Sequence, residues 1–440
     1  MRPIIKPQLL LIGLLGFFSG LPLALTASTL TAWLADEKVA RASIGLFAAI
    51  ATPYALKFLW APLLDGLRIP ILTARLGRRR SWLLITQIML ASAIAAMAFT
   101  TPAIDPWMTA LVGVVIATLS ATQDTAIDAY RVERLTPEQQ GSGAAWATFG
   151  YRIGMLVSGA GALYLADHVG WRMTYLFMAA VVASSLLITL LMRESSVAHT
   201  LDSEPCVASH GEPQSGGGLG ARPPSVRLFL QNYVVAPFRD FMTRPMWLGV
   251  LAFVILYKLG DAFMGVMFNP FLLDIGFTKT QIAQVVKFYG LIATILGTFA
   301  GGWLVGHAGM FRSLLLCGVM HMLTNLLLVM QAQIGADVHF LTFTISLENF
   351  TGGMSTAAFI AYLSALCRIN YTATQYALLS SLAAFGRTWL STPSGALAEA
   401  VGWELFFAIA SLMAIPGLLL LIWLERKKKA SPLQQPTLSL

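Results

Sequence analysis

The stretch WMTALVGVVIATLSATQDTAIDAY, residues 107–130, decides the fold class. It is long enough to cross the hydrocarbon core of a bilayer as one helix, although it contains two carboxylates, Asp124 and Asp128. The whole chain has this character: 57% of its 440 residues are hydrophobic and 11% are charged, whereas a soluble protein carries about 25% charged residues. Lipid is therefore the expected solvent, and long apolar runs favour helices over a β-barrel.

Twelve apolar runs are long enough to span a membrane, at about 20 residues per span. We expect an all-α membrane protein with transmembrane helices near residues 9–33, 43–64, 82–100, 107–130, 142–166, 172–192, 245–270, 280–303, 312–332, 339–366, 372–398 and 403–424. The first run is longer than the apolar region of a signal peptide, so we expect it to be a spanning helix.

The positive charges indicate an orientation. If the N-terminus is cytoplasmic, 20 of the 29 Lys and Arg residues fall in cytoplasmic segments and 4 on the opposite side, the others lying within spans. Such a bias is typical of membrane topology, and it predicts that both termini are cytoplasmic. Because the net charge of +8 lies in these short loops, we do not expect nucleic acid as a partner.

The chain divides into two related halves. We expect a six-helix bundle over 1–192, a largely flexible cytoplasmic linker over 193–244, a second six-helix bundle over 245–424 and a basic cytoplasmic tail over 425–440. Within the linker, residues 225–240 have the pattern of a membrane-surface helix. The two bundles share short motifs at a spacing near 232–236 residues, such as Val-Gly-Trp at 169–171 and 401–403. This repeat is the layout of the major facilitator superfamily, in which substrate binds between the halves.

Charged residues inside the predicted spans indicate transport. Each costs roughly 2.5 to 3.5 kcal/mol at a helix centre, so each requires a reason. Leaving out charges at the first two positions of a run, none lies on the third, sixth, ninth or twelfth run, which are the outer helices of the facilitator architecture. These residues are Lys57, Asp124, Asp128, Arg152, Lys258, Asp261, Lys287, Glu348 and Arg387.

The acids are candidates for proton coupling. Asp124 and Asp128 share a helix face at i,i+4, and two neighbouring carboxylates do not both ionise readily in a low dielectric. The alternative is that a fixed cation such as Lys57 or Arg152 neutralises them. Asp128 is also close enough to the predicted cytoplasmic edge to belong to a gate. The full set of candidates is Asp124, Asp128, Asp261 and Glu348.

The second half offers its own ion pairs. Lys258 and Asp261 are i,i+3 and either pair with each other or bind substrate or proton. Glu348 either titrates or pairs with Lys287 or Arg387. The candidates for substrate binding are Lys57, Gln123, Arg152, Lys258, Lys287 and Arg387. The candidates for a cytoplasmic gate are Asp65, Arg78, Arg79, Arg80 and Arg131.

Other polar and small residues are assigned structural roles. For His321 and Asn325, on the outer ninth run, a polar contact to a neighbouring helix is favoured over a role in transport. Gly150, Gly154 and Gly161 predict close helix packing. We expect no disulfide, metal site, cofactor or enzymatic activity, because Cys206, Cys317 and Cys367 have no paired spacing and metalloprotease, serine-hydrolase and phosphate-loop motifs are missing.

Several long motifs resemble those of the AmpG muropeptide permeases. They include PYALKFLWAPLLD at 53–65, SATQDTAIDAYRVE at 120–133, YKLGD at 257–261 and YTATQYALLSSL at 371–382, and the similarity runs from the first span to the last. The resemblance implies a facilitator-fold permease of the bacterial inner membrane that imports anhydromuropeptides with protons, for peptidoglycan recycling and β-lactamase induction. The two acids of the family's ATQD motif correspond to Asp124 and Asp128, and the charged pair of its YKLGD motif corresponds to Lys258 and Asp261.

The expected partners are therefore an anionic glycopeptide, protons and the lipid bilayer, and we expect a monomer. The buried Lys and Arg side chains suit the carboxylates of such a cargo. Two alternatives stay open at this stage. One is a facilitator for another anion such as acetyl-CoA, to whose transporters the resemblance extends more weakly. The other is a membrane assembly or sensor protein that retains the fold without transporting.

Overall fold

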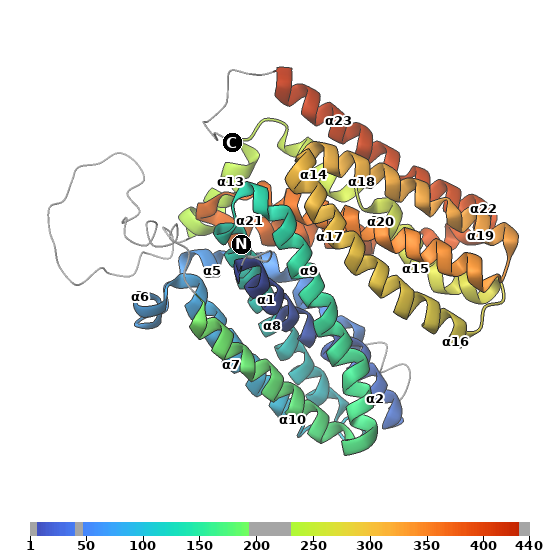
Figure 1. Cartoon of the computed structure of the whole chain (residues 1–440). Helices are drawn as coiled ribbons and strands as arrows, with labels where there is room; N and C mark the ends of the chain where they lie inside the picture. Colours follow the sequence, from blue (N-terminus) through green and yellow to red (C-terminus); the bar gives the residue numbers. More distant parts are fainter. Residues whose placement is uncertain (1–6, 40–46, 193–229, 431–440) are drawn as a thin grey trace, which may run out of the picture.

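The computed structural model describes residues 7–39, 47–192 and 230–430, and every regular element among them is helical. The two predicted bundles are separate in space (Figure 1). Residues 193–229, which form most of the expected linker, and the end of the tail beyond 430 lie outside the described residues.

The first half forms helices that follow the predicted runs, with short 3₁₀ or π-helical turns (η) between some of them. The elements are α1 (Pro7–Ala24), η1 (Leu25–Thr29), α2 (Leu30–Asp36), η2 (Ala48–Ala51), α4 (Thr52–Leu56), η3 (Lys57–Leu59), α5 (Ala61–Gly66), α6 (Leu72–Leu76), α7 (Arg78–Met97), α8 (Pro106–Arg134), η4 (Pro137–Gln139), α9 (Gln140–Leu156), η5 (Val157–Gly161) and α10 (Ala162–Leu191).

The second half repeats this plan after a short helical segment that falls within the expected linker. The elements are η6 (Leu230–Val235), α13 (Ala236–Met242), α14 (Trp247–Leu256), α15 (Leu259–Asp274), α16 (Lys279–Ile282), η7 (Ala283–Tyr289), α17 (Gly290–Ala308), α18 (Met310–Asn325), α19 (Leu327–Ile334), α20 (Val338–Ala365), η8 (Ile369–Tyr371), α21 (Thr372–Leu390), α22 (Ser394–Leu412) and α23 (Ala414–Ala430).

Within the described residues, eight helical stretches are long and apolar enough to cross a membrane, or nine if one bent pair counts as a span. This number is below twelve because two stretches, Pro137–Leu191 and Ser394–Lys428, run through a break in the helix. In addition, residues 48–66 are divided among elements that are each shorter than a span.

The backbone carries the repeat that the sequence predicts. Gly77 and Gly309 each precede a helix with φ of 84° and 79°, and Gly170 and Gly402 break a helix with φ of 79° and 75°. Both pairs are 232 residues apart in the sequence. Only glycine adopts this left-handed backbone without strain, so the same turns are fixed in both halves.

Side-chain contacts repeat as well. Trp171 Nε1 donates to Asp36 Oδ2 at 2.8 Å in the first half, and Trp403 Nε1 donates to Asp274 Oδ2 at 3.2 Å in the second. The two halves are therefore similar scaffolds.

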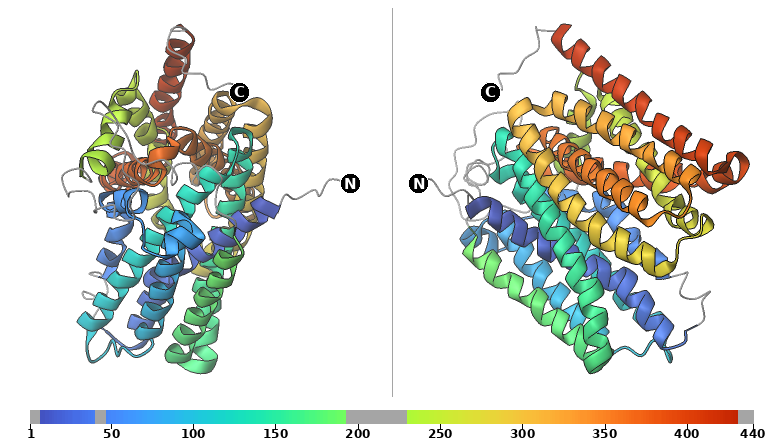
Figure 2. Two further views of the ribbon diagram at one scale, coloured as in Figure 1. Left: turned by 90° about the vertical axis from the view of Figure 1, so that its left-hand side faces the viewer. Right: turned by 45° about the vertical axis from the view of Figure 1, so that its right-hand side comes forward.

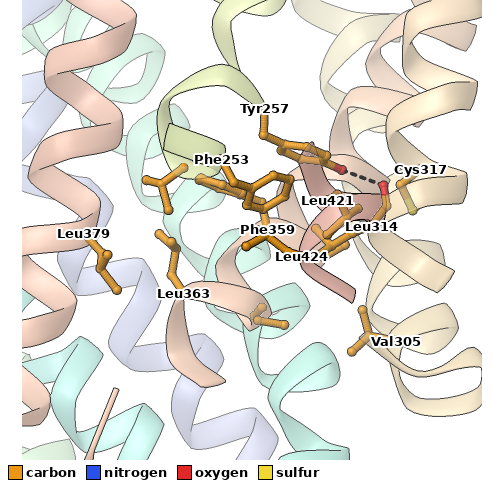
Figure 3. Close-up of a cluster of buried hydrophobic side chains, with 14 of the residues drawn as sticks. Phe253, Tyr257, Val305, Leu314, Cys317, Phe359, Leu363, Leu379, Leu421 and Leu424 are labelled. Atoms are coloured by element: carbon orange, nitrogen blue, oxygen red, sulfur yellow. Dashed lines mark hydrogen bonds between the residues drawn. The ribbon is translucent and has the colours of Figure 1, made fainter. Parts of the chain in front are cut away.

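Each half has its own apolar core. In the second half, Phe253, Tyr257 and Phe359 pack together with leucines of α18 and α23 (Figure 3). The Tyr257 hydroxyl donates to the Leu314 carbonyl at 3.0 Å, which satisfies the buried phenol and joins α14 to α18. Burial of these aromatic side chains fixes the first part of the seventh predicted span next to the polar cluster described below.

The halves meet at the end where α5 and α13 lie and spread apart from there (Figures 1 and 2). We call this the linker end. Near it, α9 and α17 are in backbone contact, because a Cβ on Gly141 would lie 2.6 Å from the Gly302 carbonyl oxygen. Further along the same two helices, Trp146 packs against Phe299 with ring centroids 5.3 Å apart.

Helix α9 also packs closely on α1. A Cβ added to Gly150 would lie 1.8 Å from the Gly13 carbonyl oxygen, and one on Gly154 would lie 2.2 Å from that of Phe17. Gly161, by contrast, has only its own helix within 4 Å, so the packing prediction is correct for the first two glycines and wrong for the third. Gly161 lies in the π-helical turn η5, beyond the region where α1 and α9 are closest.

We predict that Gly150→Ala destabilises the protein while Gly161→Ala leaves it unchanged. The added methyl group at position 150 forces two backbones apart, and such overpacking costs about 1–3 kcal/mol. Thermal unfolding in detergent measures the difference. Equal unfolding temperatures for the two variants would show that α1 and α9 are not in this contact.

Candidate functional site

Asp124 lies in the interior of the first half, on α8. Its Oδ1 accepts a hydrogen bond from Ser19 Oγ of α1 at 2.6 Å, and the residue is 9% exposed. Next to it, Gln123 Nε2 donates to the Phe18 carbonyl at 3.0 Å, which uses this amide to join α1 and α8. Asp124 therefore has a specific hydrogen-bond donor, whereas the described contacts of Gln123 are structural.

Lys57 is the cation that interacts electrostatically with the Asp124 carboxylate. It begins the 3₁₀ turn η3, where the second predicted span is interrupted between α4 and α5. The side chain is half-buried. Trp60, just after the turn, donates from Nε1 to Thr122 Oγ1 at 3.0 Å and fixes this interruption against α8.

Arg152 corrects one prediction, because its side chain is exposed rather than buried. It lies on the same face of α9 as Gly141 and Ala145, at the i+11 and i+7 positions. Those two residues contact α17 of the other half near the linker end. Arg152 therefore lies on the face of α9 that contacts the second half near the linker end.

The second half contains an ionic cluster around Asp261. Lys258 Nζ lies 2.9 Å from Asp261 Oδ2, so the i,i+3 pair predicted from the sequence is present. On the other side, His321 Nε2 lies 2.8 Å from Asp261 Oδ1. Lys258 also donates to Ser355 Oγ at 3.1 Å and Thr356 Oγ1 at 3.4 Å, both on α20.

A break in the seventh predicted span positions this cluster. Helix α14 ends at Leu256 and α15 begins at Leu259, with Lys258 in a non-helical conformation at the N-terminal boundary of α15. Asp261 falls in the first turn of α15, where a carboxylate interacts favourably with the helix dipole.

Glu348 belongs to the same electrostatic environment. Asn349 Nδ2 donates to Glu348 Oε2 at 2.8 Å, and Glu348 interacts electrostatically with His321, Asp261 and Lys258. The partners proposed for Glu348 from the sequence were Lys287 and Arg387. Their side chains lie outside the described part of the structure.

His321 is a site residue that sequence reasoning assigned to structure alone. The expected contact to a neighbouring helix exists, but the neighbour is the carboxylate of Asp261. The residue is 6% exposed, on α18, which corresponds to an outer helix of the fold. The sequence shows only a histidine within an apolar run, and it does not identify the partner of this side chain.

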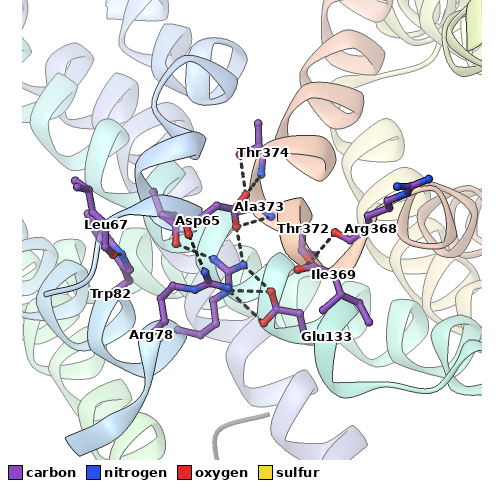
Figure 4. A network of polar contacts seen from close by, with 12 residues as sticks. Asp65, Leu67, Arg78, Trp82, Glu133, Arg368, Ile369, Thr372, Ala373 and Thr374 are labelled. Carbon is purple, nitrogen blue, oxygen red and sulfur yellow. Dashed lines mark hydrogen bonds and ion pairs between the residues drawn. The ribbon is translucent and has the colours of Figure 1, made fainter. Parts of the chain in front are cut away.

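At the linker end, Asp65 joins the two halves (Figure 4). Its Oδ2 accepts hydrogen bonds from the backbone N–H of Thr374 at 2.8 Å and from its hydroxyl at 2.7 Å, both at the start of α21. Its Oδ1 binds Arg79 Nη2 at 2.7 Å, and Arg79 is also bonded to Glu133 at 2.5 Å. A carboxylate of the first half thus caps a helix of the second.

The other predicted gate residues have different roles. Arg78 donates to the Asp65 backbone carbonyl at 2.7 Å, and Arg131 donates to Ser364 Oγ of the second half at 3.0 Å. Arg131 also lies 3.4 Å from Asp128 Oδ1, which places Asp128 with the gate residues. Arg80 instead donates to the backbone carbonyls of Thr189 and Leu190, within the first half.

A second network at this end was not predicted. Asp240, on α13, binds Arg244 at 2.8 Å and Arg368 at 2.5 Å and accepts from Gln375 Nε2 at 3.0 Å. The segment expected to be flexible linker therefore has an ordered end attached to the loop before α21. Asp240 lies in a polar segment between apolar runs, so the sequence did not indicate that its carboxylate would be bound by other side chains.

Comparison with known proteins places the chain in a family. The model of the Major Facilitator Superfamily matches residues 12–391. The chain is 40% identical over 421 residues to the anhydromuropeptide permease of Escherichia coli (strain K12), which covers 95% of this chain and 79% of that protein. It is 34% identical over 416 residues to the putative transporter AmpG 4 of Rickettsia felis, covering 94% and 95%.

Solved structures agree on the fold. The proton:xylose symporter XylE matches with a TM-score of 0.66 and 13% identity over 94% of both chains. The human organic anion transporter MFSD10 matches with a TM-score of 0.63 and 16% identity over 94% of this chain and 98% of that one. The chain therefore belongs to the AmpG-type permeases of the major facilitator superfamily and is a transporter, not an enzyme.

Proposed function

We propose that this transporter imports anhydromuropeptides into the bacterial cytoplasm together with protons. The observation that carries the proposal is the 40% identity to the anhydromuropeptide permease of Escherichia coli, which extends over 95% of the chain. In this proposal the linker end faces the cytoplasm, in agreement with the predominance of Lys and Arg in the segments at that end.

The chemistry of the candidate site suits an anionic load. Muropeptides carry carboxylates, and moving each negative charge against an inside-negative potential costs about 2.3 kcal/mol per 100 mV. Lys57, Arg152 and Lys258 are the described cations that we assign to substrate, with Lys287 and Arg387 added from the sequence. Co-transported protons offset the remaining negative charge.

Asp124 is our first choice for the coupling proton. Its carboxylate lies in the interior with a hydroxyl donor from Ser19 and one electrostatically interacting cation, Lys57. Such a carboxylate can bind or release a proton while Ser19 and Lys57 rearrange around it, without unfolding of the surrounding helices. Asp261 and Glu348 follow as further candidates, whereas the contact of Asp128 with Arg131 favours a role in the gate.

The gate proposal follows from the contacts of Asp65. The carboxylate holds the start of α21 only while the linker end is closed, so opening towards the cytoplasm has to break these bonds. Alternating access then exchanges a closed linker end for a closed opposite end, with the substrate between the halves.

We predict that Asp124→Asn abolishes proton-driven accumulation of anhydromuropeptide. The amide keeps the size of the side chain but does not ionise. The variant therefore lacks the group that binds the coupled proton. Uptake of radiolabelled anhydromuropeptide into inverted and right-side-out vesicles, with and without a pH gradient, measures this effect. Excess unlabelled acetyl-CoA as a competitor tests the alternative substrate class.

Asp105→Asn provides a matched control on the same helix. Asp105 caps the start of α8 by accepting from the Met108 N–H at 3.0 Å, and asparagine retains this cap. We expect normal uptake from this variant. Accumulation by Asp124→Asn equal to that of the control would remove Asp124 from the coupling mechanism.

We also predict that weakening the gate opens the linker end. Thr374→Val removes one hydrogen bond to Asp65, worth about 1 kcal/mol, which corresponds to about a fivefold shift in the open-to-closed ratio. Asp65→Asn, which removes the charge of a buried pair, should have a larger effect of about 3–5 kcal/mol.

Spin labels at Glu138 and Asn370, which are exposed on opposite halves, report this equilibrium through double electron–electron resonance distances in a cysteine-free background. Thr374→Ser retains the hydroxyl and serves as the control. A distance distribution in Asp65→Asn that matches the wild type would contradict the assignment of Asp65 to the gate.

A further inference from the structure

His321 lies in an unusual position for a group that carries charge. It belongs to α18, whose counterpart in the fold faces lipid, yet its ring is directed inward and its side chain is 7% exposed. The ring nitrogen Nε2 lies 2.8 Å from Asp261 Oδ1, and the same carboxylate binds Lys258 through Oδ2 at 2.9 Å. One carboxylate is thus shared by a permanent cation and by a cation that exists only after proton uptake.

The other ring nitrogen has a partner that fits both protonation states. His321 Nδ1 lies 3.1 Å from Thr351 Oγ1, which lies 2.7 Å from Thr324 Oγ1. Thr324 can in turn donate to the His321 carbonyl at 3.0 Å. Because a hydroxyl both donates and accepts, Thr351 donates to Nδ1 of the neutral ring and accepts from N–H of the charged ring.

Proton uptake at Nδ1 therefore breaks no hydrogen bond of the His321 ring itself. The two hydroxyls reverse direction, and Nε2–H continues to donate to Asp261. A histidine whose surroundings satisfy only one form resists titration, whereas this environment accommodates both. The cavity beside the pair, about 10 Å³ and lined by Asp261, His321 and Asn325 among others, has room for about one water molecule.

Several charged or titratable groups face His321 among the described side chains. They are Lys258 and Asp261 at the break in the seventh span, Tyr257 beside them and Glu348 on α20. Cys317, one turn before His321 on α18, interacts electrostatically with Lys258. While the ring is neutral, two carboxylates of this cluster share the single ammonium group of Lys258. When the ring is protonated, the two carboxylates have two cations.

We propose that His321 is a positioning residue that couples proton uptake to anion binding by competing with Lys258 for Asp261. The neutral ring leaves Lys258 bound to Asp261. The protonated ring takes over this carboxylate, and Lys258 becomes available to a carboxylate of the substrate. Lys258 is 18% exposed, and its other two described acceptors are neutral hydroxyls, so its release requires no further ion pair to break.

This inference rests on the proposed function and adds a mechanism to it. Thermodynamic linkage requires that a proton which strengthens substrate binding is itself bound more tightly when substrate is present. The result is symport of a proton with an anion. The outer helix α18 then participates in transport through one side chain, without lining the path of the substrate.

The test measures anhydromuropeptide affinity in nanodiscs between about pH 9 and pH 5, where an ordinary histidine changes its charge. For the wild type we expect binding to tighten by roughly tenfold as the pH falls, a typical coupling between two sites. His321→Gln keeps an N–H for Asp261 but cannot gain a charge, and its affinity should lose most of this pH dependence.

Two controls separate proton coupling from packing. His307→Gln changes an exposed histidine, bonded to the Trp303 carbonyl on α17, and should behave like the wild type. Thr351→Val removes the acceptor for Nδ1–H and should weaken the pH dependence, whereas Thr351→Ser should restore it. An unchanged pH dependence in His321→Gln would overturn the inference.

Histidine NMR of the wild-type protein provides a readout that needs no substrate. The ring signals of His321, assigned by their loss in His321→Gln, should change from the neutral to the charged form over this pH range. A ring that stays in one form throughout overturns the inference, whatever the substrate is. Absence of anhydromuropeptide binding at every pH, with a titrating ring, instead refutes the proposed function.

Discussion

The constraint on which this structure depends is the free-energy cost of a charge inside a low-dielectric helix bundle. A charged side chain in this environment persists only if a partner satisfies it or water reaches it. Asp65, Asp124 and Asp261 each meet this requirement with donors from a different helix, so each also joins elements that are distant in sequence. The polar contacts that satisfy the charges are therefore the same contacts that link the moving parts.

The internal repeat shows how the two halves divide their tasks. The N-terminal caps of α8 and α20, Asp105 and Asp337, are 232 residues apart, which aligns Asp124 with Thr356. In the first half a carboxylate at this position accepts from Ser19 of α1. In the second half a hydroxyl at the same position accepts from Lys258 at the break between α14 and α15. Equivalent helix junctions thus hold an acid in one half and a cation in the other, as the proposed co-transport of protons with an anion requires.

Much of this arrangement could be predicted from the sequence, because hydrophobic runs and the Val-Gly-Trp repeat depend only on the local chain. The Lys258–Asp261 pair was predictable for the same reason, since the two residues are only three positions apart in the sequence. Contacts between distant elements were not. The exposure of Arg152 depends on how the helices around α9 pack, and the attachment of Arg80 to Thr189 and Leu190 depends on how α10 ends.

His321 and Asp240 form contacts between distant elements that the sequence did not predict. The position of His321 on an outer helix suggested a structural contact, and its partner, Asp261 of α15, could be identified only from the folded structure. Asp240 lies in a segment with the composition of a linker, but its carboxylate meets two arginines and Gln375 in the folded chain. Amino-acid composition thus predicts whether a segment prefers water or lipid, but it does not identify which side chains a given residue contacts.

The central claim is that the charged side chains of both halves face one water-accessible space that binds the substrate. Single cysteines at Lys57, Arg152 and Lys258, in a chain without native cysteines, test it through labelling by a membrane-impermeant thiol reagent. The account predicts labelling at all three positions, and protection by anhydromuropeptide wherever the two remaining cations still bind it. Labelling only by a lipid-soluble reagent, or no protection at any position, would contradict it.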